Sequence, residues 1–345
     1  MASVGNYQSF PTDGTPPPVP EIQQYLRKIS LVVYGTDLSS NGTNGLDLSS
    51  LRIKFNVKRS DTMTPNVADI RVYNVSSETA LSMLINLSPT TGSSGLLQNH
   101  GKVILQAGYD SNFGVIFQGN IKQIILGRES ATDTFVDIIA GDGEHAYNFA
   151  IVNTTIAAGA TPQNQLNAVV NATKPLGVGL GYVGDTQGPN LPRGKVMFGN
   201  AKNYARAIAN NTNQTWSIQD EQITFVPVSS YVPGTQVFLS SKTGLIGTPQ
   251  QTNVGLDVKC LLNPFIKIGG LINIDEAIVA DYKINLSAPG SPANNPAPLT
   301  QDGVYYVMVA EHSGDTRGIE WYTSMICINK DVTTNPLNSV EVGYG

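Results

Sequence analysis

Two short stretches of the chain alternate strictly between apolar and polar residues. Their apolar positions are Leu51, Ile53, Phe55 and Val57 in the first stretch and Ala68, Ile70 and Val72 in the second. A period of two is typical of a β-strand that buries one face. Further strands are expected at 102–108, 115–126 and 132–140, with Gly and Asn clustered between them, and a short helix is expected after Ser77. The pattern favours a compact, strongly bent sheet or barrel.

The middle of the chain has a different pattern. Thr161 is a helix-capping residue type and Pro162 suits the first helical position, so a helix is expected from there to Lys174. A second helix is expected after Asn200, followed by two strands around an acidic turn, and together these form a small α+β unit. The last third returns to strands, which are expected at 254–262, 271–274, 277–286, 304–312 and 319–328, with a turn-rich link at 312–318.

We therefore expect a β-rich α+β chain in which an α+β insert separates two β units. The first 20 residues contain five prolines, which excludes a helix or a central strand there and predicts an extended arm. The expected division is an arm at 1–26, a first β-barrel-like domain at 27–150, the α+β insert at 151–240, a second β-barrel-like domain at 241–335 and a tail at 336–345.

Charged residues are unusually sparse, at 14% of the chain against roughly 25% in an ordinary soluble domain. This predicts a surface that is covered by other subunits or that is polar without charge. With 21 basic and 26 acidic residues the net charge is −5, which argues against a protein that holds nucleic acid through its phosphates. DNA that passes through a channel without being held is compatible with this charge.

Membrane insertion and a secreted disulfide scaffold are both disfavoured. The longest apolar run, 304–310, is far shorter than the roughly 20 residues of a spanning helix, and the N-terminus lacks the pattern of a Sec signal peptide. The chain has two cysteines, Cys260 and Cys327. We expect both thiols to be reduced and buried in a protein made in the cytoplasm.

No stretch carries a complete catalytic or cofactor motif. Residues 179–184 match G-x-G-x-x-G, a motif of dinucleotide-binding folds, where it follows a strand and opens a helix. Here a helix is expected before the motif and none can open after it, so a Gly-rich turn is favoured over a dinucleotide site. Asp142 and Glu144 could be the paired carboxylates of a hydrolase, although they flank a glycine in an expected turn, where solvated carboxylates are ordinary. His312 and Asp315 could both bind a metal, but two ligands make no structural metal site, and a hydrogen bond in a turn is favoured. We therefore expect no catalytic residue, no metal and no cofactor.

Three regions share an order and spacing with a known family. The first has LPRGKVMFG at 191–199 and WSIQDEQITF at 216–225; the second has TGLIGTP at 243–249, GLDVKCLLNP at 255–264 and IGG at 268–270; the third has GVYYVMV at 303–309, EHSGD at 311–315 and WYT at 321–323. As a set they resemble the baseplate hub proteins of tailed bacteriophages. The residues that carry the resemblance are Gly194, Gly199, Trp216, Gly244, Gly247, Pro249, Gly255, Asn263, Pro264, Gly269, Gly303, His312, Asp315 and Trp321. The glycines of the second region, with Gly270, would serve tight turns or bends, and Asn263 and Pro264 would end a strand.

The resemblance implies two small β-barrel domains per subunit, with the α+β insert between them, and a homotrimer of pseudo-sixfold symmetry. The implied partners are the tail tube protein, the central spike, the baseplate wedge proteins and the tape-measure protein, with DNA passing through unbound and no membrane. Such a protein is a structural part of the virion at the distal tail, assembled in the bacterial cytoplasm, and not an enzyme. Two alternatives stay open: a tail-associated cell-wall hydrolase using Asp142 and Glu144, and a non-phage β-rich binding module.

Overall fold

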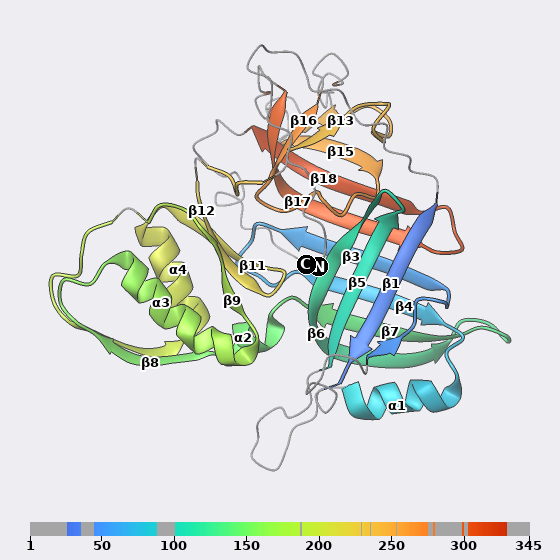
Figure 1. Cartoon of the computed structure of the whole chain (residues 1–345), viewed down its shortest axis with the longest axis horizontal. Helices are drawn as coiled ribbons and strands as arrows, with labels where there is room; N and C mark the ends of the chain where they lie inside the picture. Colours follow the sequence, from blue (N-terminus) through green and yellow to red (C-terminus); the bar gives the residue numbers. More distant parts are fainter. Residues whose placement is uncertain are drawn as a thin grey trace, which may run out of the picture.

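The computed structural model of the chain describes residues 26–35, 45–87, 101–186, 188–228, 230–234, 236–252, 254–274, 279, 299 and 303–329. Apart from the single residues Leu26 and Val279, the expected N-terminal arm, the C-terminal tail and the strand expected at 277–286 lie outside these ranges. The described chain forms two β units and an insert, which lies to one side of them (Figure 1). No helix among the described residues is long and apolar enough to cross a membrane.

The first β unit follows from the alternation in the sequence. Its elements are β1 (Arg27–Tyr34), β2 (Leu46–Asp47), β3 (Ile53–Ser60), β4 (Val67–Tyr73), α1 (Ser77–Leu87), β5 (Lys102–Tyr109), β6 (Asn112–Arg128) and β7 (Thr134–Gly141). In β3 the apolar side chains of Ile53, Phe55 and Val57 are buried, while Lys54 and Lys58 face solvent. The strands expected in this part of the chain are therefore confirmed, as is the short helix after Ser77.

The insert has its own core of helices and strands. Its elements are α2 (Glu144–Phe149), β8 (Ile151–Ile156), α3 (Pro162–Thr173), the 3-10 turn η2 (Lys174–Leu176), β9 (Gly179–Val183), β10 (Lys195–Asn200), α4 (Ala201–Asn211), β11 (Gln214–Gln219) and β12 (Gln222–Pro227). Thr161 caps α3 by accepting a hydrogen bond from the backbone N–H of Asn164, and Asn200 caps α4 in the same way through Lys202. Both expected helices are confirmed.

The interpretation of 179–184 as a turn was wrong. Residues Gly179–Val183 form β9, which pairs in parallel with β12. A Cβ atom at Gly181 would lie 2.9 Å from Oγ1 of Thr224, so a glycine lets the two strands approach closely. Glycine carries no side chain to show a period of two, which is why the strand gave no alternation signal.

The second β unit contains β13 (Val237–Leu239), β14 (Gln250–Gln251), β15 (Leu256–Leu261), β16 (Leu271–Ile274), β17 (Val304–Asp315) and β18 (Trp321–Asn329). The strands expected near 254–262, 271–274, 304–312 and 319–328 are confirmed. Strand β17 continues to Asp315, so the link to β18 is shorter than expected, because residues 309–315 pair along their full length with β3.

Both β units belong to one 13-stranded sheet. Its order is β14-β15-β18-β17-β3-β4-β7-β6-β5-β1-β2, with β16 beside β17 and β13 beside β16. The sheet curls, so that Trp321 of β18 donates from Nε1 to the carbonyl oxygen of Gly108 in β5, and Arg27 of β1 donates to the carbonyl of Gly318. The β-rich α+β class is confirmed. No closed barrel is found among the described strands, so the pair of barrels stays a prediction.

The two β units repeat one topology. The orders β3-β4-β7-β6-β5-β1 and β14-β15-β18-β17-β16-β13 correspond strand for strand. The corresponding pairs are antiparallel in both units, except that β13 runs parallel to β16 whereas β1 runs antiparallel to β5. The chain therefore contains an internal structural duplication with the insert between its two copies.

The correspondence extends to register. The long strand β6 has a bulge between Ile121 and Gln123, in its pairing with β7. The long strand β17 has a bulge at the equivalent place, between Val307 and Val309, in its pairing with β18. Aligning these bulges places ADIRVY at 68–73 on LDVKCL at 256–261.

An ion–ring contact is repeated as well. Arg71 lies over the ring of Phe135 at 4.0 Å from its centroid, and the corresponding Lys259 lies over Tyr322 at 4.3 Å. These pairs occupy matching positions in the two units, so the duplication holds at the level of single side chains.

Candidate functional site

The contact between the two β units is a strand pairing. Residues Val309 to Asp315 of β17 pair with Ser60 to Lys54 of β3 in antiparallel register. His312, in the middle of this pairing, is fully buried, and its Nδ1 lies 2.9 Å from the hydroxyl oxygen of Thr323. Burial lowers the pKa of His312 to about 3, so the imidazole is neutral. His312 was expected both to end a strand and to begin the turn-rich link; the β3 pairing extends β17 through it to Asp315, so it lies within the strand.

Asp315, at the end of the same strand, serves a separate contact. Arg52 donates to both carboxylate oxygens, from Nε at 3.3 Å and Nη2 at 2.7 Å, and this hydrogen bonding lowers the pKa of Asp315. His312 and Asp315 are three residues apart in one strand, so their side chains leave opposite faces of the sheet. They do not form a metal pair.

The insert is joined to both β units by a cluster of buried and half-buried polar side chains that we call the polar junction. Its members are Arg59, Asp61, Asn66, Asp142, Asp220 and Lys267. At its centre, Asp142 accepts hydrogen bonds from the backbone N–H groups of Asp220 and Glu221, at 2.7 and 2.8 Å, and from Nδ2 of Asn66 at 3.2 Å. Asp142 follows β7 and thereby holds the β11–β12 turn against the first β unit.

Burial raises the pKa of Asp142 to about 7, and the nearby Arg59 and the N–H of Glu221 oppose the rise. The expectation that this carboxylate is solvated was wrong, because Asn66, 76 residues earlier, and the backbone of Asp220 and Glu221 in the insert, 78 and 79 residues later, supply its hydrogen-bond donors.

Arg59 connects the first β unit to the β11–β12 turn of the insert. Only 2% of it is exposed; it donates to the carbonyl oxygen of Ile116 at 3.2 Å and to Gln219 at 3.1 Å, and its Nη1 lies 3.0 Å from Asp220. Lys267 of the second β unit also contacts Asp220, at 3.0 Å. Burial alone would raise the pKa of Asp220, but these two cations outweigh it and lower the pKa.

The turn that enters the junction has a strained backbone. Asp220 and Glu221 have φ angles of 54° and 60°, a left-handed conformation that non-glycine residues rarely adopt. Glu221 forms an ion pair with Lys102 at 2.8 Å and accepts from Gln118. The polar partners of this turn thus come from the first and second β units, and they hold a conformation that the turn would not favour alone.

A second buried carboxyl lies between the insert and the second β unit. Asp61 accepts hydrogen bonds from the hydroxyl groups of Tyr306 in β17 and Thr215 in β11. Burial raises the pKa of Asp61 to about 6, and the two hydroxyl donors oppose the rise. The polar junction therefore fixes the insert to both units.

Asp142 and Glu144 do not face a common cleft. Glu144 is partly exposed at the start of α2, where it pairs with Lys122 at 3.3 Å and accepts from Asn148 at 2.7 Å. Asp142 is occupied within the junction. Across the described residues, no group of three or more His, Cys, Asp and Glu side chains could hold a metal ion.

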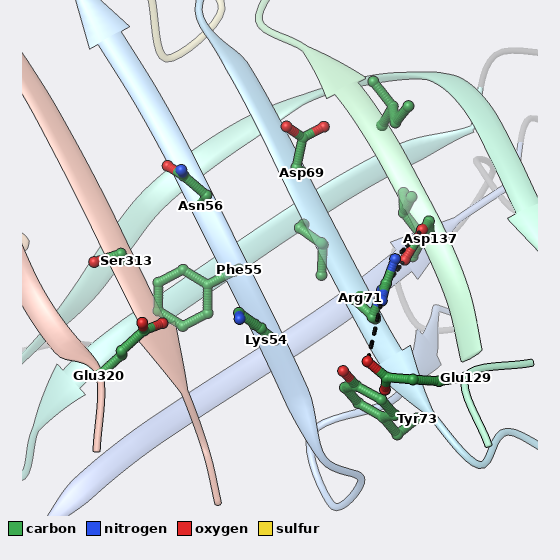
Figure 2. A pocket seen from close by; sticks show the side chains of 13 residues that line it. Lys54, Phe55, Asn56, Asp69, Arg71, Tyr73, Glu129, Asp137, Ser313 and Glu320 are labelled. Atoms are coloured by element: carbon green, nitrogen blue, oxygen red, sulfur yellow. Dashed lines mark hydrogen bonds and ion pairs between the residues drawn. The ribbon is translucent and has the colours of Figure 1, made fainter. Parts of the chain in front are cut away.

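A surface groove of about 580 Å³ lies on the face of β17, β3, β4 and β7, over the contact between the two β units (Figure 2). Asp137 and Glu129 hold Arg71 in the groove, while Lys54 and Asp69 have no ion pair among the described residues. Its lining residues are Lys54, Phe55, Asn56, Asp69, Ile70, Arg71, Tyr73, Glu129, Asp137, Ile138, Ile139, Ser313 and Glu320. Charged and polar side chains make up most of this lining.

The residues that carry the family resemblance are dispersed rather than gathered into one site. Gly244, Gly247, Gly269 and Gly303 have φ angles of 99°, 70°, 79° and 68°, which favour glycine. At Gly255, a Cβ atom would lie 2.3 Å from the carbonyl oxygen of Cys327. Gly194 precedes β10, Gly199 lies within it, and Pro249 is buried beside β14.

The two tryptophans lie in different cores. Trp216 stacks with Tyr147 and Phe225 inside the insert, at centroid distances of 6.4 and 6.5 Å. Trp321 packs edge-on against Phe55 in the core of the first β unit, at 5.5 Å.

The loop after β15 contains Asn263 and Pro264. Asn263 accepts a hydrogen bond from the N–H of Phe265 and donates its own N–H to Thr323, and Pro264 lies against Gly114. Cys260 and Cys327 are free and buried, as expected.

The sequence carried one overlooked signal for the polar junction. Arg59 continues the buried phase of β3 after Ile53, Phe55 and Val57, so a charged residue stands where the alternation requires an apolar one. A buried arginine needs a carboxylate partner. Its partner, Asp220, lies in the acidic turn that the sequence did indicate.

Comparison with known proteins gives matches of structure only. No family model and no curated protein matches the sequence. The 43 kDa tail protein of prophage MuSo2 from Shewanella oneidensis is similar with a TM-score of 0.54 at 8% identity, over 88% of this chain and 99% of that one. A tail protein from Neisseria meningitidis MC58 is similar with a TM-score of 0.53 at 10% identity, over 90% and 99%.

A Francisella PdpA-VgrG complex contains a third similar chain. Its TM-score is 0.52 at 8% identity, over 89% of this chain and 59% of that one. At these identities the likeness concerns the fold alone. The chain has the fold of phage tail proteins, and at the level of fold this confirms the resemblance to baseplate hub proteins.

Proposed function

We propose that this chain is the baseplate hub of a tailed phage, a structural homotrimer that joins the sixfold tail tube to the threefold central spike. The observation that carries the proposal is the internal duplication. Each chain offers two β units of one topology, so three chains in a ring offer six near-equivalent positions to a sixfold partner. The tail-protein fold supports the same assignment.

The partners would be the tube protein on one side and the spike on the other, with wedge proteins outside and the tape-measure protein nearby. The net charge of −5 fits a ring through which DNA leaves during ejection without being held at its phosphates. The site of action would be the distal tail of the virion, after assembly in the bacterial cytoplasm.

The role of the chain would be structural and not enzymatic. Asp142 is committed to the polar junction and Glu144 to a surface ion pair, so the hydrolase alternative has no cleft that contains both. A cell-wall digestion assay tests that alternative: turnover that Glu144→Gln abolishes, while the fold is kept, would favour the hydrolase over the hub.

A reconstruction of the particle that contains this chain tests the proposal directly. We expect three copies around the tail axis, with the two β units of each copy alternating around the ring. Six copies in one ring, or copies placed away from the axis, would contradict the proposal. A protein that stays monomeric and belongs to no particle would favour the non-phage binding module.

A further inference from the structure

The insert exposes an apolar face on its two-stranded sheet of β8 and β10. Val196 and Phe198 of β10 are 72% and 71% exposed, and Ile151 of β8 is 61% exposed. Phe198 lies two residues before Asn200, which is the partner of Ile151 in the strand pairing. Paired residues share a face of a sheet, as do alternate residues of one strand, so the three apolar side chains lie together. We call this surface the ribbon face, and its residues are Ile151, Asn153, Thr155, Val196 and Phe198.

The opposite face of the same two strands belongs to the core of the insert. Val152 and Met197 lie there and are 1% and 0% exposed. The ribbon face cannot turn inward, because a shift of one residue would bring those two side chains out into solvent.

Phe198 is also fixed through its backbone. The hydroxyl group of Tyr204 in α4 accepts a hydrogen bond from the N–H of Phe198 at 2.8 Å and donates to its carbonyl oxygen at 3.2 Å. The exposed ring thus stands on a backbone that is already ordered. A rigid, exposed aromatic side chain is the usual anchor of a protein–protein contact, since little freedom is lost when it becomes buried.

The charges on the surface of the insert are mostly positive. From residue 151 to residue 228 the chain has five cations and three carboxylates. Asp220 and Glu221 are committed to ion pairs of the polar junction, which leaves Asp185 as the remaining carboxylate. The cations are Lys174, Arg193, Lys195, Lys202 and Arg206. Arg193 precedes β10 and Lys202 follows it, so a cation stands at each end of the strand that carries Phe198.

The rest of the chain is acidic, with 16 of the 21 basic residues and 23 of the 26 acidic ones. The groove on β17, β3, β4 and β7 belongs to this part (Figure 2). Its charged lining residues are the carboxylates Asp69, Glu129, Asp137 and Glu320 and the cations Lys54 and Arg71, which gives a net charge of −2. Arg71 pairs with Asp137 and Glu129. Asp69 and Glu320 have no ion pair among the described residues, so the groove can accept cations from another molecule.

The ribbon face and the groove do not meet within one chain. The lining of the groove includes no residue of the insert, and the apolar side chains of the ribbon face are more than half exposed. The insert projects to one side of the β units, and β8 runs along its rim (Figure 1). A neighbouring molecule can therefore reach this face.

We propose that the ribbon face of one copy of this chain docks in the groove of the next copy. Phe198 enters the groove, and Arg193 and Lys202 face the carboxylates of Asp69 and Glu320. Opposite charges guide the two surfaces together and fix their orientation, while the apolar side chains become buried.

This inference rests on the proposed trimer and names the surfaces that build it. The contact joins two different surfaces, so each copy uses its ribbon face on one side and its groove on the other. Three copies close a ring when each contact turns the chain by one third of a circle.

Exchange of the charges tests the contact. Assembly of full-length chains is followed by analytical ultracentrifugation at low ionic strength, up to about 1 mM. Arg193→Glu combined with Lys202→Glu should raise the concentration at half assembly at least about tenfold, and Asp69→Lys combined with Glu320→Lys should do the same. A chain with all four substitutions should recover assembly, because the opposite charges then face each other again. Failure of both pairs to weaken assembly would contradict the contact, as would a four-fold variant that does not recover.

A matched pair of substitutions controls for net charge. Lys28→Glu combined with Lys242→Glu makes the same change of charge at exposed positions outside both surfaces. This variant should assemble like the unmutated chain. An equal loss of assembly here would show that net charge, and not the proposed contact, is responsible.

The apolar part of the contact has its own test. Val196→Ser combined with Phe198→Ser should also raise the concentration at half assembly at least about tenfold. Leu81→Ser combined with Ile85→Ser, at residues 53% and 59% exposed on α1, should leave it unchanged. Circular dichroism checks that each variant keeps the fold.

The outcomes separate this contact from the hub proposal. A trimer that none of the substitutions weakens refutes the contact and leaves the trimeric hub standing. A chain that stays monomeric up to about 1 mM also refutes the contact, while the particle reconstruction decides on the hub. An open series of oligomers that the substitutions abolish supports the contact and counts against a ring of three. Binding of duplex DNA that Arg193→Glu and Lys202→Glu abolish, without any effect on assembly, would refute the contact and assign the basic surface to nucleic acid.

Discussion

Replacing Asp142 by asparagine should flatten the dependence of folding stability on pH. Asparagine keeps the shape of the side chain and removes its titration. Folding moves the pKa of this carboxyl from about 3.9 in an unfolded chain to about 7. Since the folded pKa is the higher one, the folded state holds the proton more tightly. The resulting stabilisation is fully present below the unfolded pKa and is lost as pH rises through 7.

The size of the effect follows from the two pKa values. Between about pH 5 and about pH 8 the wild-type chain should lose about 2.5 kcal/mol of unfolding free energy through Asp142 alone. Asp61, whose pKa is raised to about 6, adds a slope of the same sign to both proteins and cancels in the comparison. The asparagine amide also faces two backbone N–H donors, which should lower stability at pH 5 by about 1–3 kcal/mol.

Urea unfolding followed by tryptophan fluorescence measures both effects, because Trp216 reports on the insert and Trp321 on the sheet. The matched control is Glu144→Gln, which removes a carboxylate two residues away that is partly exposed. Equal pH slopes for wild type and Asp142→Asn, or an equal change of slope in the control, would refute the reasoning.

Three further outcomes are expected. Gly255→Ala should destabilise the second β unit by at least about 2 kcal/mol in urea unfolding, because its Cβ would meet the carbonyl oxygen of Cys327 at 2.3 Å. Burial raises the pKa of the Cys260 and Cys327 thiols, so neither should react with maleimide until denaturant is added; rapid labelling in buffer would contradict this. Arg59→Met should lower stability by about 1–3 kcal/mol, because the carbonyl oxygen of Ile116 loses its donor from Arg59 and Asp220 keeps only Lys267 as an ion partner, whereas the exposed Arg206→Met should change stability by less than about 0.5 kcal/mol.

Local patterns in the sequence were sufficient to predict most strands and helices. Alternation in β3 placed Ile53, Phe55 and Val57 in the core, and Thr161 with Pro162 marked the start of α3. In these places the residue type and the neighbouring positions decide the conformation. The resemblance to hub proteins used the same kind of information over a longer span.

Contacts between distant segments could not be predicted in this way. The burial of Asp142 depends on a turn 78 residues later, and the burial of His312 depends on β3, more than 250 residues earlier. Two β units were expected, but the sequence alone could not establish that they are duplicates, because they share strand order and register while few of their aligned residues are identical. The one local signal was the position of Arg59, a charged residue at a place in β3 where the alternation predicts a buried side chain.

The place of the insert bears on how such a chain can change during evolution. It lies between the two copies of the duplicated unit and interrupts neither, so the sheet does not depend on the insert for any of its strand pairings. A different domain could replace it without loss of the strand pairings of the sheet, provided that a backbone turn with two free N–H groups still meets Asp142 and a carboxylate still meets Arg59. Related chains should therefore differ most in this segment, in both length and fold, while keeping the two repeats.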